Sequence, residues 1–74
     1  MPVEEEHRVA CHLDQLLQER GMTLAALAEQ VGVSVVNLSV LKNNRAKAVR
    51  FSTLTAICEV LQCDVGDVLS TNRR

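Results

Sequence analysis

A very short break between two helical segments constrains this chain more than any other feature of its sequence. Residues 24–31 carry apolar side chains at helical spacing, and Thr23 offers a hydroxyl N-cap in front of them. Gly32 permits the positive φ of a sharp turn, and Ser34 offers the N-cap of a second helix at about residues 35–43. The sequence therefore predicts two short helices that meet at an angle.

The residues around this break have the sizes that such a junction needs. Ala28 is small enough to let the second helix approach closely, and Val33 is placed to fill the angle between the helices. Leu38 and Leu41 lie on one face of the second helix, where they can pack into a core. We therefore expect these leucines to face inward and the opposite side of the helix to face outward.

Three further helices are predicted around this pair. An apolar stripe predicts a helix over about residues 5–20, which Gly21 would end, and its members are Val9, Leu13, Leu16 and Leu17. Ser52 offers the N-cap of a fourth helix, whose apolar face comprises Leu54, Ile57, Cys58 and Leu61. Asp64 offers the cap of a short fifth helix that contains Val65, Val68 and Leu69.

The length and composition favour one all-α domain. A chain of 74 residues has room for a single small core and for no second domain. Aliphatic side chains dominate, and we expect the only aromatic residue, Phe51, to anchor the core. We predict a compact five-helix fold over about residues 5–69, followed by a frayed tail at residues 70–74.

The charge is segregated along the chain, although the net charge is only -1. Between Ser34 and Thr53 there are four basic residues and no acidic residue, whereas the remainder carries four basic against nine acidic residues. A concentrated positive stretch can attract phosphate locally, while the acidic remainder discourages indiscriminate binding to nucleic acid.

The turn segment LAEQVGVS at residues 27–34 is followed by RFSTL at 50–54 and by LQCDVGDVL at 61–69. Over about residues 9–69 this combination resembles the Cro and CI phage-repressor type of helix-turn-helix regulator, in particular its small single-domain members. The resemblance implies a DNA-binding transcriptional repressor in which the helix at about residues 35–43 enters the major groove of an operator duplex. The helix before it would cross the phosphate backbone. The sequence departs from the family's pattern at Leu24, where a glutamine often contacts phosphate.

The outward face of the second helix supplies the candidates for contact with base edges. With Leu38 and Leu41 facing inward and 100° per residue, these candidates are Val35, Val36, Asn37, Ser39, Val40 and Asn43. The valines can read DNA only through thymine methyl groups or through shape, whereas the polar side chains can form hydrogen bonds.

The basic stretch supplies the candidates for phosphate contact, because in the family the loop after the recognition helix usually meets the sugar-phosphate backbone. These candidates are Lys42, Asn44, Arg45, Lys47 and Arg50, and Thr23, at the start of the first helix of the pair, is a further one. If Lys42 and two of the basic loop residues each neutralise a phosphate, the slope of log affinity against log salt should be about -2.7 per monomer.

So few contacts would hold a single half-site weakly, which predicts a homodimer on half-sites about one helical turn apart. The sequence does not decide whether the dimer surface is the fifth helix or the N-terminal helix. The apolar residues of both helices could equally belong to the core. The main alternative function is a protein-interaction module or antitoxin-like partner, in which Val36 and Val40 form an apolar patch for another polypeptide.

Other chemistry is not indicated. The chain has no Gly-rich phosphate loop and little bulk for a substrate cleft, so we expect no enzyme, cofactor or small-molecule ligand. Neither the pair Cys58 and Cys63 nor the pair His7 and His12 has the spacing of a zinc site. With Cys11 they make an odd set of cysteines, which indicates reduced thiols at or near the core and leaves a redox role open for Cys63. Without a signal or membrane segment in its sequence, the chain is expected in the cytoplasm.

Overall fold

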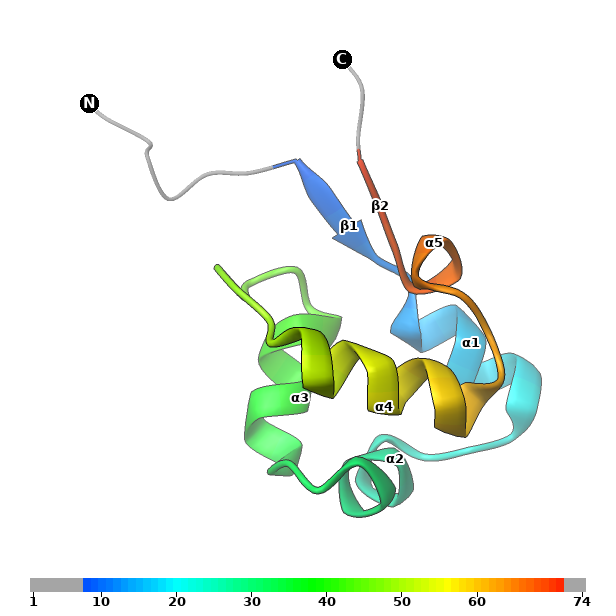
Figure 1. The fold of residues 1–74 in the computed structure, drawn as a ribbon. Coiled ribbons are helices and arrows are strands. Elements are labelled where there is room, and N and C mark those ends of the chain that lie inside the picture. Colours follow the sequence, from blue (N-terminus) through cyan, green and yellow to red (C-terminus); the bar gives the residue numbers. More distant parts are fainter. Residues whose placement is uncertain (1–7, 72–74) are drawn as a thin grey trace.

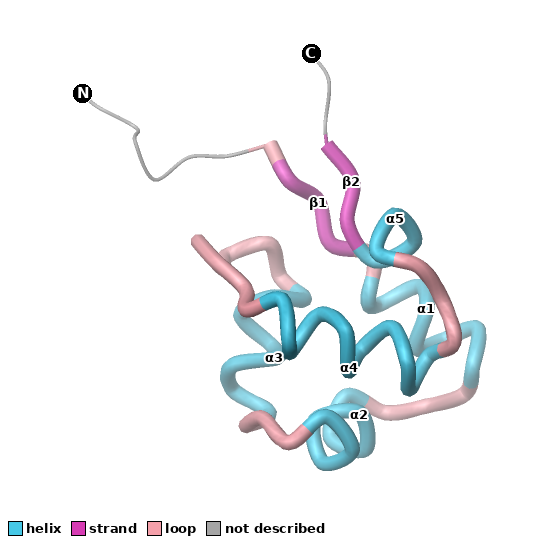
Figure 2. The backbone as a smooth tube through the Cα atoms, viewed as in Figure 1, coloured by secondary structure: helices cyan, strands magenta, loops and turns pink. Residues whose placement is uncertain are grey.

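The computed structural model describes residues 8–71, which form five helices and two short strands (Figure 1). Their order is β1 (Val9–Cys11), α1 (Leu13–Arg20), α2 (Leu24–Val31), α3 (Val35–Lys42), α4 (Phe51–Leu61), α5 (Val65–Val68) and β2 (Leu69–Thr71). The predicted five-helix, mainly helical fold is confirmed. The two strands form a small antiparallel sheet at one end of the molecule (Figure 2).

The first helix begins later than predicted. Cys11 pairs with Leu69 and Val9 with Thr71, so these backbone groups are used in the sheet rather than in a helix. The N–H of His12 donates to the Val68 carbonyl at 2.7 Å, and α1 starts at the next residue. The prediction of helix over residues 8–12 was therefore wrong, and its part before residue 8 lies outside the described residues.

The C-terminal tail also differs from the prediction. Ser70 and Thr71 were expected to fray, but they belong to β2 and extend the pairing with β1. The His12 ring and the Ser70 hydroxyl are 2.6 Å apart, which joins the two segments a second time. Residues 72–74 of the predicted tail lie outside the described residues.

The core is aliphatic and is shared by all five helices. The fully or almost fully buried side chains are Leu13, Leu16, Leu17, Leu27, Ala28, Leu38, Leu41, Leu54, Ile57, Leu61 and Val68. Leu38 and Leu41 lie inside as predicted, which confirms the rotation of α3 about its axis. No buried side-chain nitrogen or oxygen in the described part of the chain lacks a hydrogen-bond partner.

Phe51 is not a core anchor, and this prediction was wrong. Its side chain is 85% exposed at the first residue of α4. Ala46 and Val49, from the loop before α4, pack against the core instead. The helix is also not capped by Ser52, because the Arg50 carbonyl already accepts from the Leu54 N–H at 2.9 Å and Ser52 lies within the first turn.

The four longer helices end in the same way. Each is followed by a residue with positive φ, directly in α1, α2 and α4 and after Asn43 in α3. The residue after that donates its N–H back to a carbonyl five positions earlier. These bonds run from Met22 to Leu17, from Val33 to Ala28, from Arg45 to Val40 and from Cys63 to Cys58. The repeated motif reverses the chain within two residues, which lets short helices pack tightly around one core.

Candidate nucleic-acid interface

The junction between α2 and α3 has the geometry of a helix-turn-helix. The two helix axes are bent by 116° relative to each other, within the range for this motif of roughly 90–120°. Gly32 has a φ of 90°, which is the positive value that the sequence predicted. The break therefore sets a fixed angle between the two helices.

The predicted N-caps of α2 and α3 are both present. The Thr23 hydroxyl accepts from the Ala26 N–H at 3.1 Å, and the Ser34 hydroxyl accepts from the Asn37 N–H at 3.0 Å. Each bond satisfies one backbone donor that the first turn of a helix leaves unpaired. Thr23 is also exposed at the start of α2, where a phosphate contact was predicted.

Packing behind the junction holds α3 in place. Ala28 is only 1% exposed and belongs to the buried core, so its small side chain is enclosed. Val33 is half-buried and packs against the core from the turn. Because Leu38 and Leu41 are buried on the inner side of α3, the opposite side of the helix faces away from the protein.

The outward face of α3 carries almost all the residues predicted to face bases. Val36 is 71% exposed, Val35 and Val40 are also exposed, and so are Asn37 and Asn43. Ser39 is half-buried, and its hydroxyl accepts from the Asn43 amide at 3.3 Å. The face is therefore mainly apolar at its centre and polar along one side.

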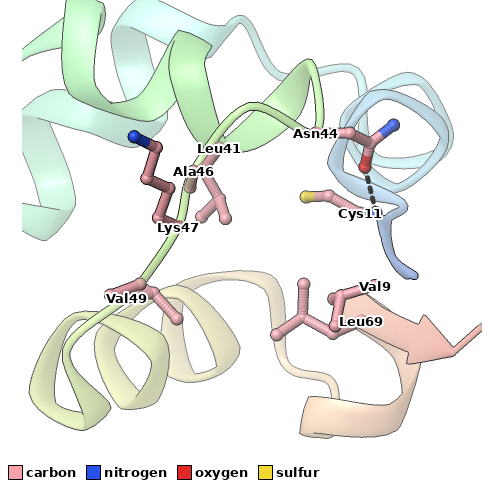
Figure 3. Close-up of a pocket in the computed structure, with 9 residues that line it drawn as sticks. Val9, Cys11, Leu41, Asn44, Ala46, Lys47, Val49 and Leu69 are labelled. Carbon is pink, nitrogen blue, oxygen red and sulfur yellow. Dashed lines mark hydrogen bonds between the residues drawn. The ribbon is translucent and has the colours of Figure 1, made fainter. Parts of the chain in front are cut away.

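Two residues predicted to contact phosphate are held by the protein itself. The Lys42 ammonium lies 3.5 Å from the Asp14 carboxylate of α1, with the lysine side chain largely covered. The Asn44 side-chain oxygen accepts from the Cys11 N–H at 2.6 Å, and Asn44 has a φ of 64° (Figure 3). This bond fixes the start of the basic loop, residues 43–50, against β1.

One open groove collects residues from α3 and from the basic loop. Ser34, Asn37 and Val40 line it from the α3 side, while Arg45, Lys47 and Arg50 line it from the loop. No acidic side chain of the described residues lines this groove. Residues predicted to contact bases and residues predicted to contact phosphate therefore border one concave, positively charged surface.

Thr53 also lines this groove, although sequence reasoning did not select it. It was missed because the fourth helix was expected to begin after Ser52. With α4 starting at Phe51, Thr53 lies in its first turn, where the helix meets the groove. The signal that could have found it is the run Arg50-Phe51-Ser52-Thr53, in which a basic residue and two hydroxyl residues lie within four positions near a helix start.

The family model that describes the Cro/C1-type HTH DNA-binding domain matches residues 12–73. The chain belongs to this Cro/C1-type family. Its DNA-binding helix-turn-helix is the α2–α3 pair. The HTH-type transcriptional regulator YozG of Bacillus subtilis (strain 168), itself uncharacterised, is 48% identical over 61 residues, which cover 82% of this chain and 73% of YozG.

Solved structures of other regulators share the fold. The transcriptional regulator VanUg matches with a TM-score of 0.76 and 34% identity, over 100% of this chain and 99% of VanUg. The N-terminal DNA-binding domain of SinR from Bacillus subtilis matches with a TM-score of 0.65 and 30% identity, over 72% of this chain and 77% of that domain. The resemblance inferred from the sequence is thus confirmed.

The remaining residues of this Cro/C1-type domain show little other chemistry. Within residues 8–71, no group of three or more histidine, cysteine, aspartate or glutamate side chains is arranged to hold a metal ion. In the same range no single helix is long and apolar enough to cross a membrane, and α2 and α3 reach the required length only together across their 116° bend. Burial raises the pKa of the Cys11 thiol, which keeps it protonated beside the basic loop.

Proposed function

We propose that this domain represses transcription by occupying an operator duplex, with α3 in the major groove and the basic loop on the phosphate backbone. The observation that carries the proposal is the groove, because it places Asn37 and Val40 of α3 beside Arg45 and Arg50. A helix that reads bases needs cationic neighbours for the flanking phosphates, and the two arginines that share its groove are candidates for that role. We expect such a protein to act in the cytoplasm.

The contacts divide between the outward face of α3 and the basic loop. Val36 and Val40 offer methyl groups to thymine, and Asn37 and Asn43 offer amides that can pair with adenine edges. Arg45, Lys47 and Arg50 offer charge that does not depend on sequence. Since Lys42 pairs with Asp14, we assign the main phosphate contacts to the loop rather than to the end of α3.

A homodimer follows from the size of this surface. Three cationic contacts and a short helix cover one half-site, and useful affinity requires two half-sites about one helical turn apart. Regulation without catalysis is the matching expectation, because DNA occupancy needs no reacting group. YozG and VanUg are both described as transcriptional regulators, which supports the regulatory part of the proposal.

The experiment measures binding to duplex DNA from upstream of the protein's own gene across a series of salt concentrations. For the wild type we expect log affinity to fall with log salt, with a slope of about -2.7 per monomer for three phosphate contacts. In the double variant Arg45→Ala, Lys47→Ala the slope should become shallower by about 1.8, because two contacts are lost.

The matched control is Arg8→Ala, which removes an exposed cation that does not line the groove. It should leave the slope within about 0.3 of the wild type, well below the value for one contact. Binding that does not depend on salt, or an equal change in the control, would count against the basic loop as the phosphate-binding element.

A second candidate function rests on the exposed apolar side chains. Val36 is 71% and Phe51 is 85% exposed, and such residues are common in protein–protein interfaces. In this alternative the same scaffold holds another polypeptide, as an antitoxin-like partner would. Substitution of Val36 separates the two functions.

A further inference from the structure

The C-terminal end of α4 differs from the other helix ends in the two side chains that its turn brings together. In this motif, the residue that donates the returning N–H usually contacts the side chain of the residue that accepts it. The pairs are Leu17 with Met22 in α1, Ala28 with Val33 in α2, and Val40 with Arg45 in α3. In α4 both positions are cysteines, Cys58 and Cys63.

The backbone holds these two cysteines close to each other. The Cys63 N–H donates to the Cys58 carbonyl at 3.0 Å, and Gln62 between them has a φ of 53°. The carbonyl of Leu61 in the same turn accepts from Arg20 Nε at 2.7 Å, which fixes this end of α4 to α1. Disulfides require Cα atoms roughly 4.4–6.8 Å apart, and a direct backbone hydrogen bond brings two residues near this range.

Both thiols are also accessible. Cys58 and Cys63 are free and half-buried, and both line one open hollow between α4 and α5. Glu59, Asp64 and Asp67 border the same hollow. The pKa of the Cys58 thiol is raised mainly by burial. The adjacent Cys63 raises it further, and the charges of Asp64 and Asp67 add to this effect. The negative surroundings oppose thiolate formation and also repel anionic reagents.

We propose that Cys58 and Cys63 are a redox-active pair that closes to an intramolecular disulfide by exchange with a small disulfide of neutral or positive charge. One cysteine thiolate attacks the small disulfide, forms a mixed disulfide and releases one thiolate of the reagent. The second cysteine thiolate then attacks the protein sulfur of the mixed disulfide and releases the other. The two cysteines lose two electrons and two protons, and the reagent leaves as two thiols.

Closure would join the last turn of α4 to the segment that leads into α5. The bond spans the turn at Gln62 and leaves the groove untouched, because no residue of this turn lines the groove. Cys11 does not take part, since it lies in β1 and lines a different hollow, beside the basic loop (Figure 3). The protein would therefore oxidise at one defined pair and keep one reduced thiol.

The test treats the native, full-length protein with cystamine, whose two amines are cationic, and in parallel with oxidised glutathione, which is anionic. After quenching and denaturation, the free cysteines are alkylated and counted by mass spectrometry. We expect one alkylated cysteine in place of three. The tryptic peptide of residues 51–73 should carry no alkyl group and should be lighter than the unalkylated reduced peptide by the mass of two hydrogens. Far-UV circular dichroism should stay unchanged, and cystamine should react about threefold faster or more at low salt.

The control variant Cys11→Ser should close the same disulfide, whereas Cys58→Ser and Cys63→Ser should each stop at a mixed disulfide. Treatment with a monothiol reductant should restore three free cysteines in the wild type. Several results would overturn the proposal: a stable mixed disulfide in the wild type, a bond to Cys11, covalent dimers, or closure only after the circular dichroism signal is lost. Equal or faster reaction with oxidised glutathione would overturn the assigned charge of the reagent.

Discussion

One edge of the outward face of α3 lines the same groove as the basic loop, yet the two regions differ in almost every physical respect. The α3 face is regular, helical and centred on the exposed valines Val36 and Val40. The loop is irregular and cationic, and its position depends on Asn44. The difference indicates that the helix supplies sequence preference and the loop supplies affinity, since methyl contacts discriminate bases and charge does not.

The largest effect is expected from a change in the core beneath α3, which supports both regions. Leu38 is 2% exposed, so Leu38→Ala should leave a cavity and destabilise the protein by about 2–5 kcal/mol. This loss is a large share of the free energy of unfolding of a small domain, which is roughly 5–15 kcal/mol. Urea unfolding measures the loss, and both base preference and salt dependence should disappear with the fold.

The matched control for Leu38→Ala is Val36→Ala on the opposite face of the same helix. Because Val36 is 71% exposed, this change should alter the free energy of unfolding by less than about 0.5 kcal/mol. If the two variants lost equal stability, the assignment of inner and outer faces of α3 would be incorrect.

The junction is the part of the fold that the sequence predicts best. The caps at Thr23 and Ser34, the positive φ of Gly32 and the burial of Ala28 all depend on local chemistry that a single segment contains. The leucine spacing of α3 then determines which face remains outside. For this reason the outward residues of α3 follow from the amino-acid sequence alone.

The ends of the chain could not be predicted in this way. Val9 fits a helical stripe with Leu13, but the chain instead pairs Val9–Cys11 with Leu69–Thr71, and neither segment shows this pairing alone. Phe51 was misplaced because hydrophobicity does not say which of several apolar residues reaches the core, and Val49 and Ala46 do so. The pairing of Lys42 with Asp14, 28 residues apart, is likewise a tertiary contact.

A smaller effect is expected from a change in α3 that tests the role of this helix alone. Val36→Asn replaces methyl groups with an amide that can pair with adenine, so the preferred base at one position should change, by about 1–3 kcal/mol. Selection from a randomised duplex library measures this change. The salt slope should remain that of the wild type, because no charge is altered.

Val36→Asn also separates the two candidate functions. An altered oligomeric state or loss of a protein partner, with an unchanged base preference, would favour the interaction module over the DNA reader. Light scattering on the free variant gives the oligomeric state, and the wild type measured at the same concentration serves as its reference.

The smallest effect concerns the loop and its attachment to β1. Asn44→Ala removes the acceptor for the Cys11 N–H and places alanine at a φ of 64°, so it should cost about 1–2 kcal/mol of stability. Asn44→Asp keeps an acceptor oxygen and should cost less. Thermal unfolding measures the stability of both variants. Equal losses of stability in the two would show that the bond to Cys11 does not hold the loop.

The most direct test of the central claim maps the surface that DNA covers, by following backbone amide chemical shifts of the protein during titration with the upstream duplex. We predict the largest changes at residues 34–40 of the turn and α3 and at residues 45–53 of the loop and first turn of α4. We predict little change in α5 and at the turn around Gln62. Changes centred on α5 and β2, with α3 unaffected, would contradict the account.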